Sequence, residues 1–318
     1  MPYSQDISRD NPGAIIFLID QSMSMNKPFT FNASGQPIRR AAYVANAVNR
    51  TMEELVSRCL REDGVRDYFE IGVIGYGKKG QPTFCWEDGL AGRKMVPISE
   101  VAANARIEER EIEIEVRGEL VKEKVAQSKW VRPAAYESTP MRAALLVAYA
   151  ALEGWVYRHP HSFPPIVINI TDGAATDVDS EDELLQAARK ITNLKTGDGH
   201  ALLFNCHIDA DGKHPIVFPR STMQLPNDPN AKLLFEMSSE MTDRQRAIIC
   251  ELLDRDLHDT PSMRSMAYNA DAVSLVKLLD IGTRQALNVP SEETLTVHKE
   301  SVAEPAPSLM KDDDWADE

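Results

Sequence analysis

Four short apolar segments, separated by longer amphipathic ones, set the strongest limit on what this chain can fold into. They are rich in β-branched and aromatic side chains, with little polar alternation: AIIFLI (14–19), YFEIGVIGY (68–76), PIVINIT (165–171) and ALLFNCHI (201–208). Strands with this pattern are typically buried on both faces, as in a parallel sheet that helices cover on each side. The four segments therefore predict the core strands of a parallel sheet.

The remaining regular segments have the apolar spacing of helices, at every third or fourth residue. They lie at 38–60, 141–156, 181–192, 243–257 and 271–286. Alternation of strands and helices over most of the chain predicts a single α/β domain, doubly wound and Rossmann-like, with helices flanking a mostly parallel sheet. We expect this domain to occupy residues 1–286.

Two parts of the chain depart from the alternation. Residues 78–136 form a long insertion, in which REIEIEVRGELVKEKV (110–125) alternates charged and apolar residues and predicts a β-hairpin. Residues 287–318 hold nine acidic side chains against two lysines and end in KDDDWADE. Such a composition cannot bury enough apolar surface to fold, so we expect an acidic, disordered tail.

Charge and cysteine content narrow the functional classes. The formal net charge of −14 argues against nucleic acid or an anionic membrane as a partner. The first dozen residues are polar, unlike a signal peptide, and the longest apolar run, 143–152, is too short to span a bilayer. Four scattered cysteines without a CxxC pair are typical of a reduced, cytoplasmic protein.

Oxygen-bearing side chains follow two predicted strands and precede one predicted helix. Asp20, Ser22 and Ser24 come directly after the first strand, Asp172 follows PIVINIT, and Thr139 stands at a helix start. Ligands bind beyond the carboxyl ends of strands in an open parallel sheet, so we expect these five residues to converge there. Two carboxylates and three hydroxyls suit a hard divalent cation, Mg²⁺ first, with Mn²⁺ or Ca²⁺ as alternatives.

The first three of these residues are ambiguous by themselves. Asp20, Ser22 and Ser24 fit a polar turn with Asx and Ser capping bonds as well as they fit a cation site. Thr139 and Asp172 favour the cation site because they place matching chemistry at the same edge. Two aspartates only balance the charge of the ion, which would stay electrophilic and ready to accept a carboxylate from a partner.

The order Asp20-x-Ser22-x-Ser24, then Thr139, then Asp172 in TDG resembles the metal-ion-dependent adhesion site (MIDAS) of von Willebrand factor A (vWA) domains. The resemblance covers about residues 12–286. It implies a vWA fold and a non-catalytic protein-interaction module whose metal is contacted by the serine and threonine hydroxyls. The two aspartates would hold the ion directly or through water.

A narrower resemblance rests on GVRDYFEIGVIGYG (64–77), FPPIVINITDG (163–173) and LLFNCHI (202–208). These segments resemble cytoplasmic bacterial vWA proteins of the tellurite-resistance type. The resemblance implies an adaptor in a stress-response or defence system, with a protein kinase and a PP2C-like phosphatase as partners. Met23 replaces a usual glycine, and Tyr136-Glu137-Ser138 stands where a Gly-Gly pair is common, but no ligating residue is lost.

The sequence is compatible with two other functions, of which the first would use the same five residues. A metal-dependent hydrolase or phosphatase would need a base or nucleophile, and the sequence places no His, Cys or Lys near the motifs. A scaffold would bind partners through the hairpin at 110–125 and the acidic tail, with a purely structural metal.

Three further motifs have ordinary structural interpretations. GYGKKG (75–80) follows a strand, but no helical pattern comes after it, which argues against a dinucleotide site. Acidic residues also cluster at 177–183, after Asp172, and there Ser180 with Glu183 predicts a helix capping box rather than a second cation site. HIDADGKH (207–214) is more typical of a turn at a strand end than of a metal site.

Overall fold

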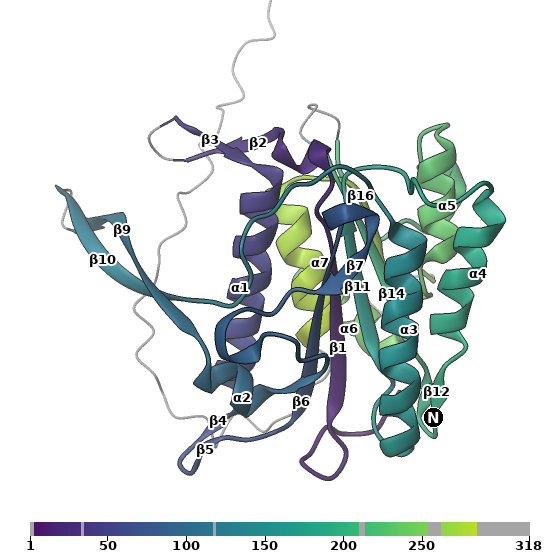
Figure 1. The fold of residues 1–318 in the computed structure, drawn as a ribbon, viewed down its shortest axis with the longest axis horizontal. Coiled ribbons are helices and arrows are strands. Elements are labelled where there is room, and N and C mark those ends of the chain that lie inside the picture. Colours follow the sequence, from purple (N-terminus) through teal and green to yellow (C-terminus); the bar gives the residue numbers. More distant parts are fainter. Residues whose placement is uncertain (1–2, 33–34, 117–118, 210–213, 254–261, 285–318) are drawn as a thin grey trace, which may run out of the picture.

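The fold is built around one mixed sheet (Figure 1). The structure is a computed structural model, and it describes residues 3–284 except 33–34, 117–118, 210–213 and 254–261. Its parallel strands lie in the order β16 (Met266–Ala270), β14 (Leu202–Ile208), β11 (Ile166–Thr171), β1 (Gly13–Asp20) and β6 (Phe69–Tyr76). Three short antiparallel strands complete its edges: β15 (Ile216–Val217), β7 (Pro82–Phe84) and β8 (Val96–Pro97). The predicted doubly wound, mostly parallel α/β fold is confirmed.

The strand order reverses beside β1, where the functional edge of such a sheet is expected. From β1 the chain adds β6 on one side, and it later returns to place β11 on the other side. The register pairs Ile19 with Ile170, so the residues that follow each strand start from the same level. Open α/β sheets bind ligands at this switch point because the two outgoing loops separate there.

The two faces of the sheet are covered by different helices, and alternate residues of β1 point to each. Ile15, Phe17 and Ile19 pack in the core of α1 (Arg40–Cys59) and α7 (Ala272–Arg284). Ile16 and Leu18 pack with α3 (Met141–Arg158), α4 (Glu181–Thr192) and α5 (Pro229–Met237). A period of two on a strand buried on both faces produces this double core.

Smaller elements surround these layers. The hairpin of β9 (Arg106–Val116) and β10 (Glu119–Lys129) projects away from the sheet and is longer than the predicted 110–125 (Figure 1). The others are α2 (Ile98–Ala103), α6 (Asp243–Leu253), β2 (Pro28–Phe31), β3 (Pro37–Arg39), β4 (Leu60–Arg61), β5 (Gly64–Val65), β12 (Lys195–Thr196) and β13 (Gly199–His200). The predicted tail, 287–318, lies outside the described residues. Within the described part of the chain, every helix is too short or too polar to cross a membrane.

A line of buried polar side chains ties the strands together below the edge of the sheet. Tyr76 Oη donates to Asn169 Oδ1 at 2.9 Å, and Asn169 Nδ2 donates to Asn205 Oδ1 at 3.0 Å. Asn205 Nδ2 in turn donates to Ser238 Oγ at 3.0 Å. All four side chains are buried, so each hydrogen bond avoids the cost of an unpaired polar group and helps fix the relative positions of β6, β11 and β14.

Candidate metal centre

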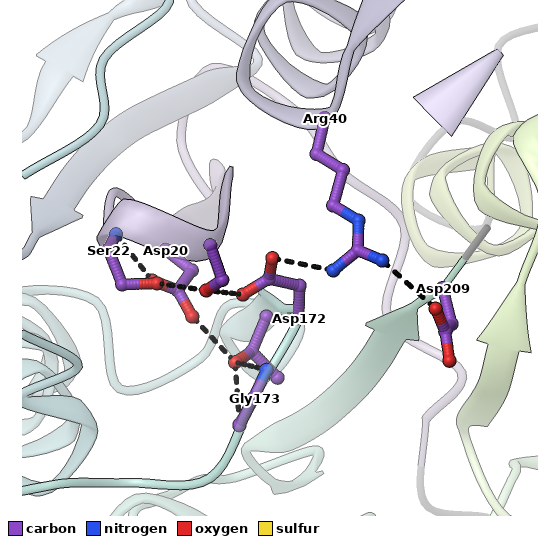
Figure 2. A network of polar contacts seen from close by, with 8 residues as sticks. Asp20, Ser22, Arg40, Asp172, Gly173 and Asp209 are labelled. Atoms are coloured by element: carbon purple, nitrogen blue, oxygen red, sulfur yellow. Dashed lines mark hydrogen bonds and ion pairs between the residues drawn. The ribbon is translucent and has the colours of Figure 1, made fainter. Parts of the chain in front are cut away.

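Asp20 is the last residue of β1, and its carboxylate is completely buried. Oδ1 accepts a hydrogen bond from the Ser22 backbone N–H at 2.8 Å, which closes an Asx turn (Figure 2). Oδ2 accepts a hydrogen bond from Thr171 Oγ1 at 2.7 Å, at the end of neighbouring β11. Asp20 therefore links the two strand ends at the switch point of the sheet.

A chain of hydroxyls runs from this turn to the second aspartate. Ser22 Oγ and Ser24 Oγ lie 2.9 Å apart, and Ser24 Oγ donates to Asp172 Oδ1 at 2.6 Å (Figure 2). The structure thus brings together four of the five residues predicted from the sequence, in one continuous hydrogen-bond network. The network spans the loops after β1 and β11.

Thr139 lies beside this network rather than within it. Its backbone N–H donates to Thr176 Oγ1 at 2.9 Å, and its carbonyl accepts from Thr176 N at 3.0 Å. Three residues earlier, Tyr136 N donates to the carbonyl of Gln21 at 2.6 Å. The segment before α3 is therefore attached to both loops, although among the described residues no hydrogen bond joins the Thr139 hydroxyl to the network.

The charge of Asp20 is not balanced by a nearby cationic side chain in the part of the chain that the structure describes. Among the described residues, no Lys, Arg or His forms an ion pair with it. Burial raises the pKa of Asp20 from 3.8 to about 6, although the hydrogen bonds from Thr171 and Ser22 lower it, and the nearby Asp172 carboxylate raises it further. A buried carboxylate that is ionised at neutral pH without a cation is costly, and a bound cation would remove that cost.

Asp172, in contrast, has a counterion that the sequence did not reveal. Arg40, the first residue of α1, is only 5% exposed. Its Nη1 donates to Asp172 Oδ2 at 2.8 Å and its Nη2 donates to Asp209 Oδ1 at 2.9 Å (Figure 2). One signal was available: a basic residue at a helix N-terminus is disfavoured by the helix dipole, so it needs a specific anionic partner.

The donors present fit a hard divalent cation. No group of three or more His, Cys, Asp or Glu side chains suited to a metal exists in the described ranges, so a cation here depends on hydroxyl and water ligands. Mg²⁺ commonly keeps several waters and takes one or two carboxylates, which matches Asp20 and Asp172 with Ser22 and Ser24 between them. The buried charge of Asp20, which forms no ion pair with another described residue, would favour such a cation.

A third aspartate holds α3 in place beside the centre. Asp177 Oδ1 accepts from Arg142 N at 3.1 Å, and Oδ2 accepts from Ala143 N at 2.8 Å. It therefore caps the helix that follows Thr139. The predicted capping box at α4 is wrong: the Ser180 side chain makes no capping hydrogen bond, and the Glu183 carboxylate instead lies 3.4 Å from Arg142 Nε.

We expect Asp177→Ala to lower the free energy of unfolding by about 1–2 kcal/mol, because two N–H groups at the start of α3 lose their acceptor. Urea unfolding monitored by circular dichroism measures the change. Asp179→Ala is the matched control, since Asp179 is an exposed acid in the same loop, and it should change stability by less than about 0.5 kcal/mol. Equal losses in the two variants would contradict the capping role.

One glycine of GYGKKG, Gly77, lies where a side chain would not fit. Its φ is +144°, and a Cβ at this position would lie 2.5 Å from the carbonyl oxygen of Gln21 and 3.2 Å from that of Ser138. The glycine therefore lets the loop after β6 approach the backbone beside Asp20 and the backbone beside Thr139. The motif serves the packing of three loops at the candidate metal centre.

No family model and no curated protein matches this chain. Matching solved structures include the vWF domain of the type V pili tip protein Mfa5 from Porphyromonas gingivalis, with 10% identity, 85% of this chain and 93% of that chain covered, and a TM-score of 0.38. The ArnB paralog VWA2 from Sulfolobus acidocaldarius has 12% identity, 63% and 36% coverage, and a TM-score of 0.29. An uncharacterized membrane spanning protein from Vibrio fischeri has 13% identity, 71% and 85% coverage, and a TM-score of 0.24. Likenesses this distant say nothing about the function of this chain.

Proposed function

We propose that this chain is a non-catalytic, metal-dependent protein-interaction module of the vWA type. Mg²⁺, or else Mn²⁺ or Ca²⁺, would be held by the five residues of the predicted site: Asp20, Ser22, Ser24, Thr139 and Asp172. The observation that carries the proposal is the buried Asp20 carboxylate, which forms no ion pair within the described residues. It accepts from the Ser22 backbone N–H, and the hydroxyls of Ser22 and Ser24 continue the network to Asp172. Strand order places this network at the switch point of the sheet, where such folds bind ligands.

The hydroxyl and carboxylate residues of the proposed site would have different roles in metal binding. Ser22, Ser24 and Thr139 would ligate through neutral hydroxyls, and Asp20 and Asp172 would contribute charge directly or through water. When bound, the cation would supply an electrophilic position for an acidic side chain of a partner protein. Among the described residues, Asp172 already shares its charge with Arg40, so the protein neutralises the cation incompletely and leaves it attractive to that carboxylate.

The geometry supports the hydrolase alternative less well. His207 is brought nearer than the sequence suggests, because β14 pairs it in register with Thr171. Its ring is stacked on Tyr268 with centroids 4.5 Å apart and is only 7% exposed, so it is poorly placed to activate a solvent nucleophile. We expect no Mg²⁺-dependent hydrolysis of p-nitrophenyl phosphate. Turnover that disappears in Asp20→Ala would replace the interaction proposal with an enzymatic one.

Metal binding is the direct test. We expect calorimetric titration of Mg²⁺ or Mn²⁺ into EDTA-stripped protein to show one site, and Ser24→Ala and Thr139→Ala to weaken it by about tenfold or more. The reason is that each removes a proposed hydroxyl ligand without removing charge. Ser180→Ala is the matched control, since this exposed hydroxyl follows the same loop and makes no capping bond. Absence of binding in the unaltered protein would contradict the proposal.

Partner choice is the second part of the proposal. The resemblance of 64–77 and 163–173 to tellurite-resistance-type proteins supports a cytoplasmic adaptor that binds a protein kinase, a PP2C-like phosphatase or both. A pull-down with each purified candidate, in Mg²⁺ and in EDTA, tests this. Binding that survives EDTA and Ser24→Ala but is lost when 110–125 is deleted would favour the scaffold alternative, in which the hairpin binds and the metal is structural.

A further inference from the structure

We propose that Arg40 is a built-in cation that competes with the metal for Asp172 and thereby sets the metal affinity of the site. The inference rests on the proposed function and deepens it. The inference is drawn from the position of the buried Arg40 guanidinium, which lies between two carboxylates (Figure 2). These belong to Asp172, after β11, and Asp209, after β14. The Arg40 and Asp172 side chains are 6% and 0% exposed, so solvent screens their interaction little.

The two oxygens of Asp172 have different neighbours. Oδ1 accepts from Ser24 Oγ at 2.6 Å, on the side of the proposed ligands, and Oδ2 accepts from Arg40 Nη1 at 2.8 Å. A divalent cation held through Ser24 and Asp172 would therefore share a carboxylate with a guanidinium. A cation and a guanidinium that contact the same carboxylate repel each other strongly where water is excluded, so Arg40 should oppose metal binding.

Asp209 should act in the opposite direction to Arg40. It pairs with Nη2 of the guanidinium at 2.9 Å and so takes up part of its positive charge. Removing the charge of Asp209 would leave Arg40 to act on Asp172 and on the metal with less compensation. The pair thus predicts effects of opposite sign: loss of Arg40 tightens metal binding, and loss of the Asp209 charge weakens it.

The position of Arg40 is unfavourable apart from its ion pairs with Asp172 and Asp209. This indicates that the two ion pairs are the reason for an arginine at this position. A cation at the first residue of α1 lies at the positive end of the helix dipole. Its Nε is buried and has no hydrogen-bond partner among the described residues, which carries a further cost. The guanidinium fork is the group that can join two separate carboxylates from one side chain, because it presents several fixed donors.

The test compares Mg²⁺ affinities by calorimetry in four stripped proteins: unaltered, Arg40→Met, Arg40→Lys and Asp209→Asn. We expect Arg40→Met to bind at least about fivefold tighter, and Asp209→Asn to bind at least about fivefold weaker. Arg40→Lys keeps the charge and should stay within about threefold of the unaltered protein. In EDTA, Arg40→Met should melt at a lower temperature, because the buried Asp172 carboxylate loses its ion pair with the guanidinium. Mg²⁺ should raise its Tm more than that of the unaltered protein.

The outcomes separate this inference from the proposed function. If the unaltered protein binds Mg²⁺ but Arg40→Met is weaker or unchanged, Arg40 has only a structural role and the inference is overturned, while the proposed function stands. If none of the four proteins binds Mg²⁺, both are overturned. Binding by Arg40→Met alone would support the competition but would contradict the proposed function, because the unaltered protein would then not hold the metal. Should Arg40→Met fail to fold, a Mg²⁺ affinity of Asp209→Asn equal to or above that of Arg40→Lys would overturn the inference.

Discussion

Asp20→Asn is expected to stabilise the metal-free protein at neutral pH by about 3 kcal/mol, which is the free-energy equivalent of raising the pKa of the carboxyl from 3.8 to about 6. The substitution removes a buried charge that forms no ion pair with any residue the structure describes, and it keeps the shape of the side chain. The introduced amide can still accept from Ser22 N and can donate to Thr171 Oγ1. Thr171 Oγ1 then retains the carbonyl of Gly173, 3.0 Å away, as its own acceptor.

The pH dependence of this effect has a definite sign. Because the pKa of Asp20 is higher in the folded protein than in the unfolded chain, its protonated form stabilises the fold below about pH 4. That stability is lost as the pH rises to about 6, and above pH 6 the loss is constant. The advantage of Asp20→Asn should therefore grow between pH 4.5 and 6 and stay level up to pH 8, as measured by urea unfolding in EDTA.

Mg²⁺ should reverse the order of the two proteins. A ligand at one thousand times its Kd stabilises the folded state by about 4.1 kcal/mol, which exceeds the advantage of Asp20→Asn, and Asp20→Asn should forfeit this gain because it loses a charged ligand. Asp172→Asn is the matched control: it removes the same charge from a residue that Arg40 already neutralises, so it should destabilise the metal-free protein. Equal effects of the two substitutions in EDTA would contradict the account of Asp20 as an uncompensated charge.

The sequence was informative about strands that are buried on both faces. AIIFLI and PIVINIT have no polar alternation because both of their faces meet helices, and each lies within one residue of the observed β1 and β11. The fifth parallel strand, β16, was not predicted. Its sequence, MAYNA, is short and lacks β-branched residues, and its place in the sheet depends on packing against β14 and α5 rather than on local preference.

Some residues of the candidate site could likewise be predicted from the sequence, and others could not. Asp20 and Asp172 could be predicted together because each follows a strand, and neighbouring parallel strands end at one edge of the sheet. Arg40 could not be joined to them, because its partners lie 132 and 169 residues away in sequence. Those contacts depend on where α1 crosses the sheet and on β14 lying beside β11, which are properties of the whole fold. The sequence pattern indicates Thr171 only as the end of a strand, because its hydrogen bond to Asp20 depends on the pairing of β1 with β11.

Gly77→Ala is expected to lower the free energy of unfolding by about 3 kcal/mol and to weaken Mg²⁺ binding by at least about tenfold. A Cβ here would lie 2.5 Å from a backbone oxygen, that of Gln21, which cannot swing aside as a flexible side chain can. The φ of +144° adds backbone strain for any residue other than glycine. The loss of stability therefore comes from a clash and from strain at the same position.

The loss of metal affinity follows from what Gln21 holds. Its N–H donates to the carbonyl of Tyr76 at 2.8 Å, and its own carbonyl accepts from Tyr136 N at 2.6 Å. Moving Gln21 would displace both its neighbour Asp20 and the segment that leads to Thr139. Calorimetry with Mg²⁺ and urea unfolding measure the two effects on the same protein.

Gly64→Ala is the control that introduces backbone strain without a steric clash. Gly64, the first residue of β5, has a φ of +112°, and a Cβ there would meet nothing within 4 Å. Its replacement by Ala should therefore cost roughly 1–2 kcal/mol and leave Mg²⁺ affinity unchanged. If Gly77→Ala were as mild as Gly64→Ala, the loops would be free to adjust. If it lost stability but kept full Mg²⁺ affinity, the metal would not depend on the contact at Gln21. A combined loss confined to Gly77→Ala would show that the close approach of three loops, and not the DxSxS residues alone, shapes the metal centre.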